Sequence, residues 1–223
     1  MAHIVALEDF SRIVSKVFPS QPGIGNGEKQ YEECLGHREF WDDLEKISVR
    51  NVKEIVVPFL NKWQCRLPYD CAQGLTDALQ SMESWLRPLR GFSIDMVDLN
   101  DSTKLKSDDR RIFMHIEDIF DVIRKVKAGR RSVAFTAASK ILHMAIPEFF
   151  VMCDKSIRNR YGCEGNGAGY ANFMFRMNFL AQDLILQADG QKKRILNCSR
   201  WKERTFARLI DNYNYVKYTL RKS

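Results

Sequence analysis

The sequence predicts an all-α fold, and three observations support this class. Apolar residues recur at helical spacing along most of the 223-residue chain, and no segment is a clear strand. Only 12 glycines and 6 prolines are present, too few for a turn-rich β-sandwich or β-barrel. Hydrophobic residues make up 45% of the chain, which suffices for a core and excludes a disordered protein. We therefore expect a compact bundle of at least nine helices.

The first half of the chain is expected to hold four helices. The first precedes the loop-forming stretch 19–27, and its inward face consists of Phe10, Ile13, Val14 and Val17. The next three are expected at Glu28–Ile47, Val52–Trp63 and Tyr69–Leu86. Pro58 is expected to kink or break the third helix, and Trp85 belongs to the apolar stripe of the fourth. The segment Gly91–Thr103 is the least helical, and at most one short hairpin is expected there.

The second half shows a clearer helical pattern. The strongest amphipathic helix covers residues 112–123, with acidic residues available before its start. The basic connector Lys125–Arg131 follows. The segment Val133–Ile146 is apolar on most faces, so we expect it at the centre of the core. The remaining elements are a short helix capped by Asp154 and ending near Gly162, a flexible loop at Gly165–Gly169, and helices near Tyr170–Gln187 and at Arg200–Leu220.

The chain length predicts one or two domains. We expect either one compact unit or two lobes, residues 1–103 and 104–223, with a cleft between them. The six cysteines and four histidines show no metal-ligand or redox spacing, so neither a metal nor a cofactor is expected. Scattered cysteines of this kind are typical of reduced thiols in a cytoplasmic protein. No apolar run is long enough to cross a membrane, and no membrane partner is expected.

Positive charge is concentrated in the last third of the chain. The net charge is +7, and residues 155–223 alone hold 14 basic against 5 acidic residues. A basic surface predicts a polyanionic partner such as nucleic acid; the alternative interpretation is a solvated basic face. Arg130 and Arg131 add to this charge locally. Trp201, between Arg200 and Lys202, is the aromatic residue we expect to be exposed for stacking on a base.

One segment carries a recognisable motif. It begins Ser132-Val-Ala-Phe-Thr-Ala-Ala-Ser-Lys140 and continues through an apolar run to Asp154, after which a basic helix follows. This arrangement resembles the central motif of the helix-hairpin-helix DNA glycosylases, in which a G-V-G-x-K-T-A hairpin opens an apolar helix and the catalytic aspartate comes later. Val133 matches the hairpin valine, and Asp154 matches the aspartate. The basic residues after it are Lys155, Arg158 and Arg160.

The resemblance implies a helical fold that binds DNA and excises a base. Asp154 would stabilise the positive charge that develops on the sugar as the glycosidic bond breaks, and would orient or deprotonate a water molecule. Ser132, Ala134 and Thr136 occupy hairpin positions that contact the nucleic acid. The basic side chains of Lys155 and Arg158 would support this contact.

The segment also departs from the family pattern. Ser132 and Ala134 replace two glycines that let the backbone approach a phosphate. Thr136 occupies the position of the lyase lysine and cannot form a Schiff base, so a monofunctional enzyme is implied. Lys140 lies one helical turn further and could substitute, although packing of its stem with its ammonium reaching solvent or a carboxylate is the alternative. Asp154 could likewise serve only as a helix cap.

Two other functions fit the same sequence. A non-catalytic helical protein could retain the fold and bind nucleic acid or a protein partner, and an enzyme could act on a nucleotide or RNA. A deep basic cleft with Asp154 at its floor would favour an enzyme, whereas a filled cleft would favour a binding protein.

Overall fold

The computed structural model describes residues 5–15, 25–96, 107–198 and 205–220. Within this part the chain is mostly helical, which confirms the all-α prediction at the level of fold class. The helices of the first half are α1 (Leu7–Val14), α2 (Gly25–Gly36), α3 (Arg38–Trp41), α4 (Val49–Asn51), α5 (Val57–Lys62) and α6 (Ala72–Leu86). Those of the second half are α7 (Ser107–Lys125), α8 (Phe135–Ala145), α9 (Lys155–Tyr161), α10 (Gly167–Gln187), α11 (Lys192–Leu196) and α12 (Phe206–Asn214).

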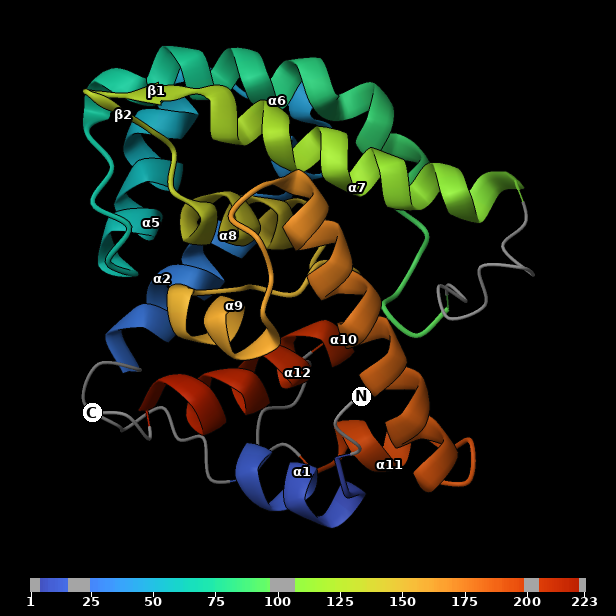
Figure 1. Cartoon of the computed structure of the whole chain (residues 1–223). Coiled ribbons are helices and arrows are strands. Elements are labelled where there is room, and N and C mark those ends of the chain that lie inside the picture. Colours follow the sequence, from blue (N-terminus) through green and yellow to red (C-terminus); the bar gives the residue numbers. More distant parts are fainter. Residues whose placement is uncertain (1–4, 16–24, 97–106, 199–204, 221–223) are drawn as a thin grey trace.

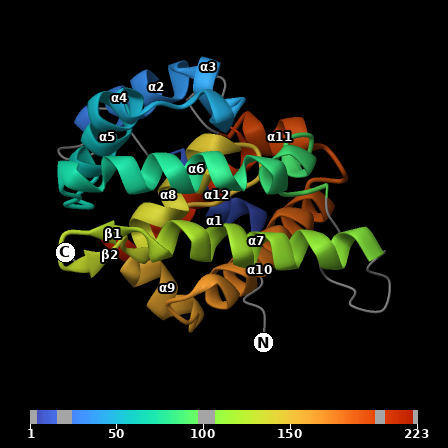
Figure 2. The same ribbon diagram turned by 90° about the horizontal axis from the view of Figure 1, so that it is seen from above.

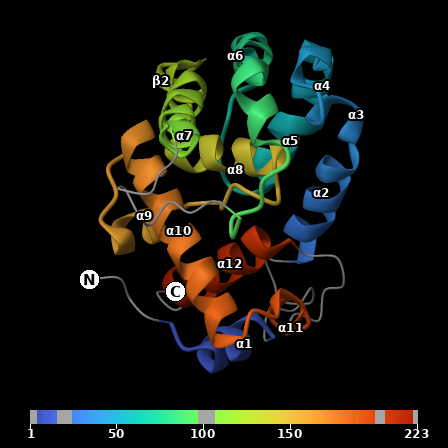
Figure 3. The same cartoon turned by 90° about the vertical axis from the view of Figure 1, so that its right-hand side faces the viewer.

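Helix α8 lies at the centre of the molecule (Figure 1). Figure 2 shows α6 and α7 side by side above it, and Figure 3 shows α2 and α5 on one side of it and α9 and α10 on the other. Ten of its eleven residues are buried, as its apolar sequence predicts; only Thr136 is half-exposed. Burial on almost all sides places Ser139, Lys140 and His143 of α8 inside the protein.

The buried apolar side chains form one cluster that draws on both halves of the chain. The cluster includes Phe10 of α1 and Tyr213 of α12, whose rings stack at a centroid distance of 5.2 Å. It also includes the inner face of α7, where the predicted 112–123 stripe faces the core at Ile112, Ile116, Ile119, Phe120 and Ile123. The division into lobes at residues 103 and 104 stays a prediction.

The one short hairpin of the described residues lies elsewhere than predicted. Strand β1 (Lys127–Ala128) pairs antiparallel with β2 (Arg131–Ser132), inside the segment expected to be a basic connector. Gly129 has a φ of 63°, a left-handed conformation that a two-residue hairpin loop requires. Residues 91–96 form turns, and the rest of the segment Gly91–Thr103 lies outside the described residues.

The single helix predicted at Glu28–Ile47 is wrong. The chain forms α2, α3 and a 3₁₀ turn at Leu44–Lys46, with a break after Gly36. Glycine is a poor helix former, and His37 takes non-helical angles. The break also brings Trp41 inward, where its indole N–H donates to the carbonyl of Cys34 at 2.8 Å. A local contact across the break thus accompanies the end of this helix.

Pro58 interrupts regular α-helix, as predicted. It lies in the first turn of α5, and the preceding turn, Val52–Val56, is π-helical. Because proline has no N–H, the usual hydrogen bond to the carbonyl of Glu54 cannot form. The π-helical turn before Pro58 accommodates this missing hydrogen bond.

Two further details differ from the prediction. Trp85 is 37% exposed, whereas the buried residues of that turn of α6 include Glu83, whose carboxylate pairs with Arg90. Helix α10 begins at Gly167, inside the stretch expected to be a loop. The N–H of Gly167 donates to Asp121 of α7 at 2.8 Å, and a Cβ at Gly167 would overlap the carbonyl oxygen of Glu117. This close approach of two helices requires glycine.

Candidate functional site

Asp154 caps helix α9, as the sequence predicts. Its backbone is extended, and its Oδ1 accepts a hydrogen bond from the N–H of Ile157 at 2.8 Å. The helix ends at Gly162, which has a left-handed φ of 62°. The side chain of Asp154 is half-exposed, whereas the segment before it, from Phe149 to Cys153, is buried. The fold therefore presents this carboxylate at the edge of the core.

A second element holds the other oxygen of Asp154. The hydroxyl of Thr219 donates to Oδ2 at 2.6 Å. Thr219 ends a π-helical turn, Tyr215–Thr219, that continues α12. Two hydrogen bonds from two segments thus fix the orientation of the carboxylate. An ionised carboxylate has about four acceptor positions, so it retains capacity for water or a ligand.

Lys140 points into the protein, and the expectation that its ammonium reaches solvent or a carboxylate is wrong. The side chain is 8% exposed, and Nζ donates to the carbonyl of Trp63 at 2.9 Å. Nζ also lies 3.7 Å from Sγ of Cys65 and 4.9 Å from the centroid of the Trp63 ring. Trp63 follows the last turn of α5, where carbonyl groups lack helical partners and favour a cation.

Burial lowers the pKa of Lys140, because removing the ammonium from water disfavours its charged form. Cys65, Asp211 and Asp154 act in the opposite direction through their negative charge. Lys140 and Asp154 therefore interact electrostatically, even though the Lys140 ammonium makes its hydrogen bond to a carbonyl. The two residues singled out in the motif lie near each other in space.

Helix α12 adds two charges that sequence reasoning missed. Arg208 and Asp211 are both buried and form an ion pair one turn apart. The guanidinium carbon of Arg208 lies 4.7 Å from the ring centroid of Tyr31 and 5.0 Å from that of Trp63. The available signal was a pair of opposite charges inside the apolar stripe of the last predicted helix. We call Lys140, Asp154, Arg208 and Asp211 the four-charge cluster.

Tyr215 stands beside the four-charge cluster and is half-exposed. Its pKa is raised by burial first, and then by the negative charges of Asp154 and Asp211. Trp63 and Thr219 are also half-exposed. The cluster therefore combines three buried charges with the half-exposed Asp154, next to half-exposed aromatic and hydroxyl side chains. Titratable groups with shifted pKa values are frequent at functional sites.

His143 belongs to the core. It is fully buried, and its Nδ1 lies 2.6 Å from the carbonyl oxygen of Phe150, so Nδ1 carries the proton and donates. Nε2 then accepts from the hydroxyl of Tyr31 at 2.9 Å. Both ring nitrogens are engaged within the protein, and His143 is a structural residue that links α2 to α8.

The hairpin residues predicted to contact nucleic acid, Ser132, Ala134 and Thr136, lie around the start of α8. Ser132 ends β2, and Ala134 is the N-cap of α8 but has no side chain that could cap it. The first N–H groups of α8 are thus left for other acceptors, which favours an anion at this end. Arg130 and Arg131 are exposed on the hairpin. Four predicted site residues therefore lie at the N-terminal end of α8: Arg130, Arg131, Ser132 and Ala134.

The basic residues of α9 reach the same region. Arg158 is half-buried, and its guanidinium lies 5.2 Å from the ring of Phe135, the first residue of α8. Lys155 is exposed at the start of α9, next to Asp154. The three predicted residues Arg200, Trp201 and Lys202 lie outside the described residues.

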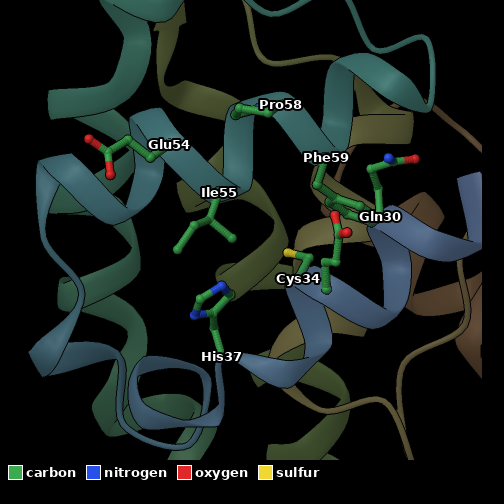
Figure 4. A pocket seen from close by; sticks show the side chains of 8 residues that line it. Gln30, Cys34, His37, Glu54, Ile55, Pro58 and Phe59 are labelled. Atoms are coloured by element: carbon green, nitrogen blue, oxygen red, sulfur yellow. The ribbon is translucent and has the colours of Figure 1, made fainter.

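A separate hollow lies between α2 and α5, and none of the predicted site residues lines it (Figure 4). Its volume is about 240 Å³, and it is lined by Gln30, Glu33, Cys34, His37, Glu54, Ile55, Pro58 and Phe59. Among the described residues, no group of three or more histidine, cysteine or acidic side chains is placed to hold a metal ion.

Comparison with known proteins assigns this chain to no family. No family model, no curated protein and no solved structure matches this chain. Within the described ranges, no helix is both long and apolar enough to span a membrane.

Proposed function

We propose that this protein binds nucleic acid and hydrolyses the N-glycosidic bond of a base in DNA, as a monofunctional glycosylase of the helix-hairpin-helix type. The observation that carries the proposal is the half-exposed carboxylate of Asp154, fixed by Ile157 and Thr219 beside the buried cation of Lys140. The helical fold and the motif around Ser132 add support. On the basis of that motif, we also propose that the fold is of the helix-hairpin-helix DNA glycosylase type.

Asp154 is the proposed catalytic residue. As the bond between sugar and base lengthens, the sugar gains positive charge, and a fixed carboxylate stabilises that charge. Water then adds to the anomeric carbon and loses a proton, while the base leaves with the bonding electrons. The two hydrogen bonds to Asp154 keep the carboxylate oriented for this step without further reorganisation.

Lys140 is proposed as an electrostatic support and not as a nucleophile. Its ammonium is buried and donates to the carbonyl of Trp63, so it is directed away from a sugar bound at the surface. Its positive charge lies near Asp154 and Asp211 and offsets their repulsion. Together with Thr136 at the lyase position, this geometry favours hydrolysis without a covalent enzyme–DNA intermediate.

The proposed binding surface joins the hairpin, the start of α8 and helix α9. Lys127, Arg130, Arg131 and Lys155 are exposed there, and the open end of α8 offers N–H groups to a phosphate. If five phosphates are neutralised, log K should fall with log salt at a slope of about −4 to −5. Replacing Arg131 or Lys155 by Ser should flatten the slope by about 1 each.

Arg50, which is exposed on α4 away from this surface, provides the matched control, and Arg50→Ser should leave the slope unchanged. Binding that does not depend on salt, or absence of binding to nucleic acid at low salt, would contradict the proposed surface.

The catalytic proposal is tested by separating charge from capping at Asp154. Asparagine is also a good N-cap, so Asp154→Asn should cost less than about 1 kcal/mol of stability. The same change removes the charge and should suppress base release by about two to three orders of magnitude. Release is measured on duplex oligonucleotides that each carry one damaged or mismatched base, and borohydride should trap no adduct on abasic DNA.

A second function, non-catalytic binding of nucleic acid or a protein, is favoured by one observation. Both oxygens of Asp154 already accept internal hydrogen bonds, so the residue has a complete structural role. In that case wild type releases no base, Asp154→Ala costs about 1 kcal/mol, and Asp154→Asn costs less. Salt-dependent binding would persist in both variants.

A further inference from the structure

We propose that Cys65 and Lys140 form a reversible covalent cross-link when a peroxide oxidises the protein. The bond joins the turn after α5 to the central helix α8. Its product is a sulfenamide, in which the lysine nitrogen is bonded directly to the cysteine sulfur. The reaction is independent of the proposed function, because it involves neither DNA nor the carboxylate of Asp154.

The two reacting atoms are already in contact. Nζ of Lys140 lies 3.7 Å from Sγ of Cys65. The two atoms share a neighbour, the carbonyl oxygen of Trp63, which lies 2.9 Å from Nζ and 3.7 Å from Sγ. Among the described residues, Cys65 is the one cysteine whose sulfur contacts a lysine nitrogen. The flexible stem of lysine allows the nitrogen to approach the sulfur further.

The backbone on both sides of Cys65 has an unfavourable conformation. Gln64 and Arg66 have φ of 62° and 53°, in the left-handed region that residues other than glycine rarely adopt. Such conformations persist only where the surrounding structure enforces them, and they are concentrated at functional sites. The two strained residues are the immediate neighbours of the cysteine that contacts Lys140, which indicates a role for this thiol beyond packing.

Hydrogen bonds hold this turn in place. The N–H of Cys65 donates to the carbonyl of Leu60 at 2.9 Å, which closes the end of α5. The side chain of Asn61 binds both backbone groups of Leu67: it donates to the carbonyl at 2.8 Å and accepts from the N–H at 2.6 Å. Cys65 therefore lies between two fixed points of the backbone, and its sulfur keeps its position beside the lysine.

Exposure and protonation suit the two residues to different roles. Cys65 is half-exposed, which gives a small peroxide access to this residue, whereas Lys140 is buried. Burial lowers the pKa of Lys140 and so increases the share of neutral amine, the nucleophilic form. Burial raises the pKa of the Cys65 thiol, and the positive charge of Lys140 opposes this rise. Because the thiolate is the form that reacts, we expect slow oxidation that requires prolonged exposure.

The reaction takes place in two steps, with hydrogen peroxide as the oxidant. In the first, the sulfur of Cys65 attacks one oxygen of the peroxide, the O–O bond breaks, and a sulfenic acid and water form. In the second, the amine of Lys140 attacks this sulfur, an N–S bond forms and the S–O bond breaks. The departing hydroxide takes a proton from the nitrogen and becomes a second water. The sulfur loses two electrons to the peroxide, and two equivalents of a thiol reductant restore amine and thiol as they form a disulfide.

The test is tryptic peptide mapping of the full chain after prolonged exposure to hydrogen peroxide. Trypsin does not cleave after a modified lysine, so the linked pair should consist of residues 63–66 and the uncut stretch 132–155. We expect this pair to be lighter than its two separate peptides by two hydrogen atoms and to disappear with dithiothreitol. Absence of the pair, an additional oxygen atom in it, or Cys65 found only in disulfides with other cysteines would overturn the proposal.

Variants and a control in urea assign the two partners. Lys140→Met removes the amine, so dimedone, which labels sulfenic acids, should now modify Cys65. Cys65→Ser should abolish both the linked pair and this label, whereas Cys163→Ser alters another half-exposed cysteine and should leave the yield of the pair unchanged. Wild type oxidised in urea should give no pair, because the contact exists only in the folded chain. An equal yield in urea, or no dimedone label on Cys65 in Lys140→Met, would overturn the proposed reaction.

Discussion

Two buried charge networks flank the central helix, and they differ in how they are paired. In the first, Glu83 of α6 and Arg90 form an ion pair at 2.7 Å. Arg90 also donates to the carbonyls of Trp41 and Ala145 at 2.7 and 3.2 Å, and Glu83 accepts from the N–H of Leu44 at 3.0 Å. Each charge is met by an opposite charge and by backbone groups, and the network joins α3, α6 and α8.

The four-charge cluster is paired less completely. Among the described residues, the ammonium of Lys140 has no carboxylate within 4 Å; it donates to a carbonyl, and its pKa is lowered by burial. Asp154 is half-exposed, and Tyr215 beside it has a raised pKa. Charged groups that lower stability and lie near solvent are typical of functional sites, whereas fully paired buried charges stabilise the fold. The difference indicates a structural role for the first network, and the catalytic role proposed for Asp154 in the second stays a proposal.

The largest effect is expected at the structural network. Glu83→Ala removes the buried carboxylate and leaves the half-buried Arg90 without its partner, which should lower the free energy of unfolding by about 3 kcal/mol. Urea unfolding measures this change. The matched control is Glu45→Ala, which breaks the exposed pair with Arg87 and should cost less than about 1 kcal/mol. Equal effects of the two changes would remove the distinction between buried and exposed pairs.

An intermediate effect is expected at Thr219. Thr219→Val keeps the shape and removes the donor to Asp154, which should cost about 1 kcal/mol of stability. It should also lower base release, because the carboxylate loses one of the two contacts that orient it. Thr219→Ser retains the hydroxyl and should restore both properties. If the serine variant behaves like valine, packing and not the hydrogen bond is the cause.

The smallest change in stability is expected at Lys140. Lys140→Met fills the same space without charge, and replacing a buried charge by an apolar group is often neutral. We therefore expect less than about 1 kcal/mol of change in the free energy of unfolding at neutral pH. A loss near that of Glu83→Ala would show that Lys140 belongs to a structural network after all.

The pH dependence of stability also tests the burial of the Lys140 charge. Burial lowers the pKa of folded Lys140 below its usual 10.5, so the unfolded chain binds this proton more tightly. The loss of stability caused by burying the charged ammonium is complete below the pKa of folded Lys140. It disappears as pH rises from that value to 10.5, so stability rises with pH in this interval. The free energy of unfolding of wild type minus that of Lys140→Met should therefore increase over the same pH interval. A difference that stays constant to pH 10.5 would contradict the lowered pKa.

Local rules predicted much of the fold and one part of the site. Asp154 caps α9 and Gly162 ends it because capping depends on residues within one turn. The central place of α8 follows from its apolar composition alone. Gly129 in the connector was a visible turn signal, yet the hairpin was expected elsewhere, since two-residue strands carry no alternation that a pattern could detect.

The helical class, the core helix and the capped aspartate thus follow from local sequence patterns. Which residues meet that aspartate depends on the packing of distant segments. Thr219 lies 65 residues from Asp154, and Trp63 lies 77 residues from Lys140. Such contacts depend on how whole helices pack against one another, and no spacing along the chain encodes the distance between two faces. The same holds for Trp85 and Glu83, where packing placed the tryptophan outward and a paired carboxylate inward.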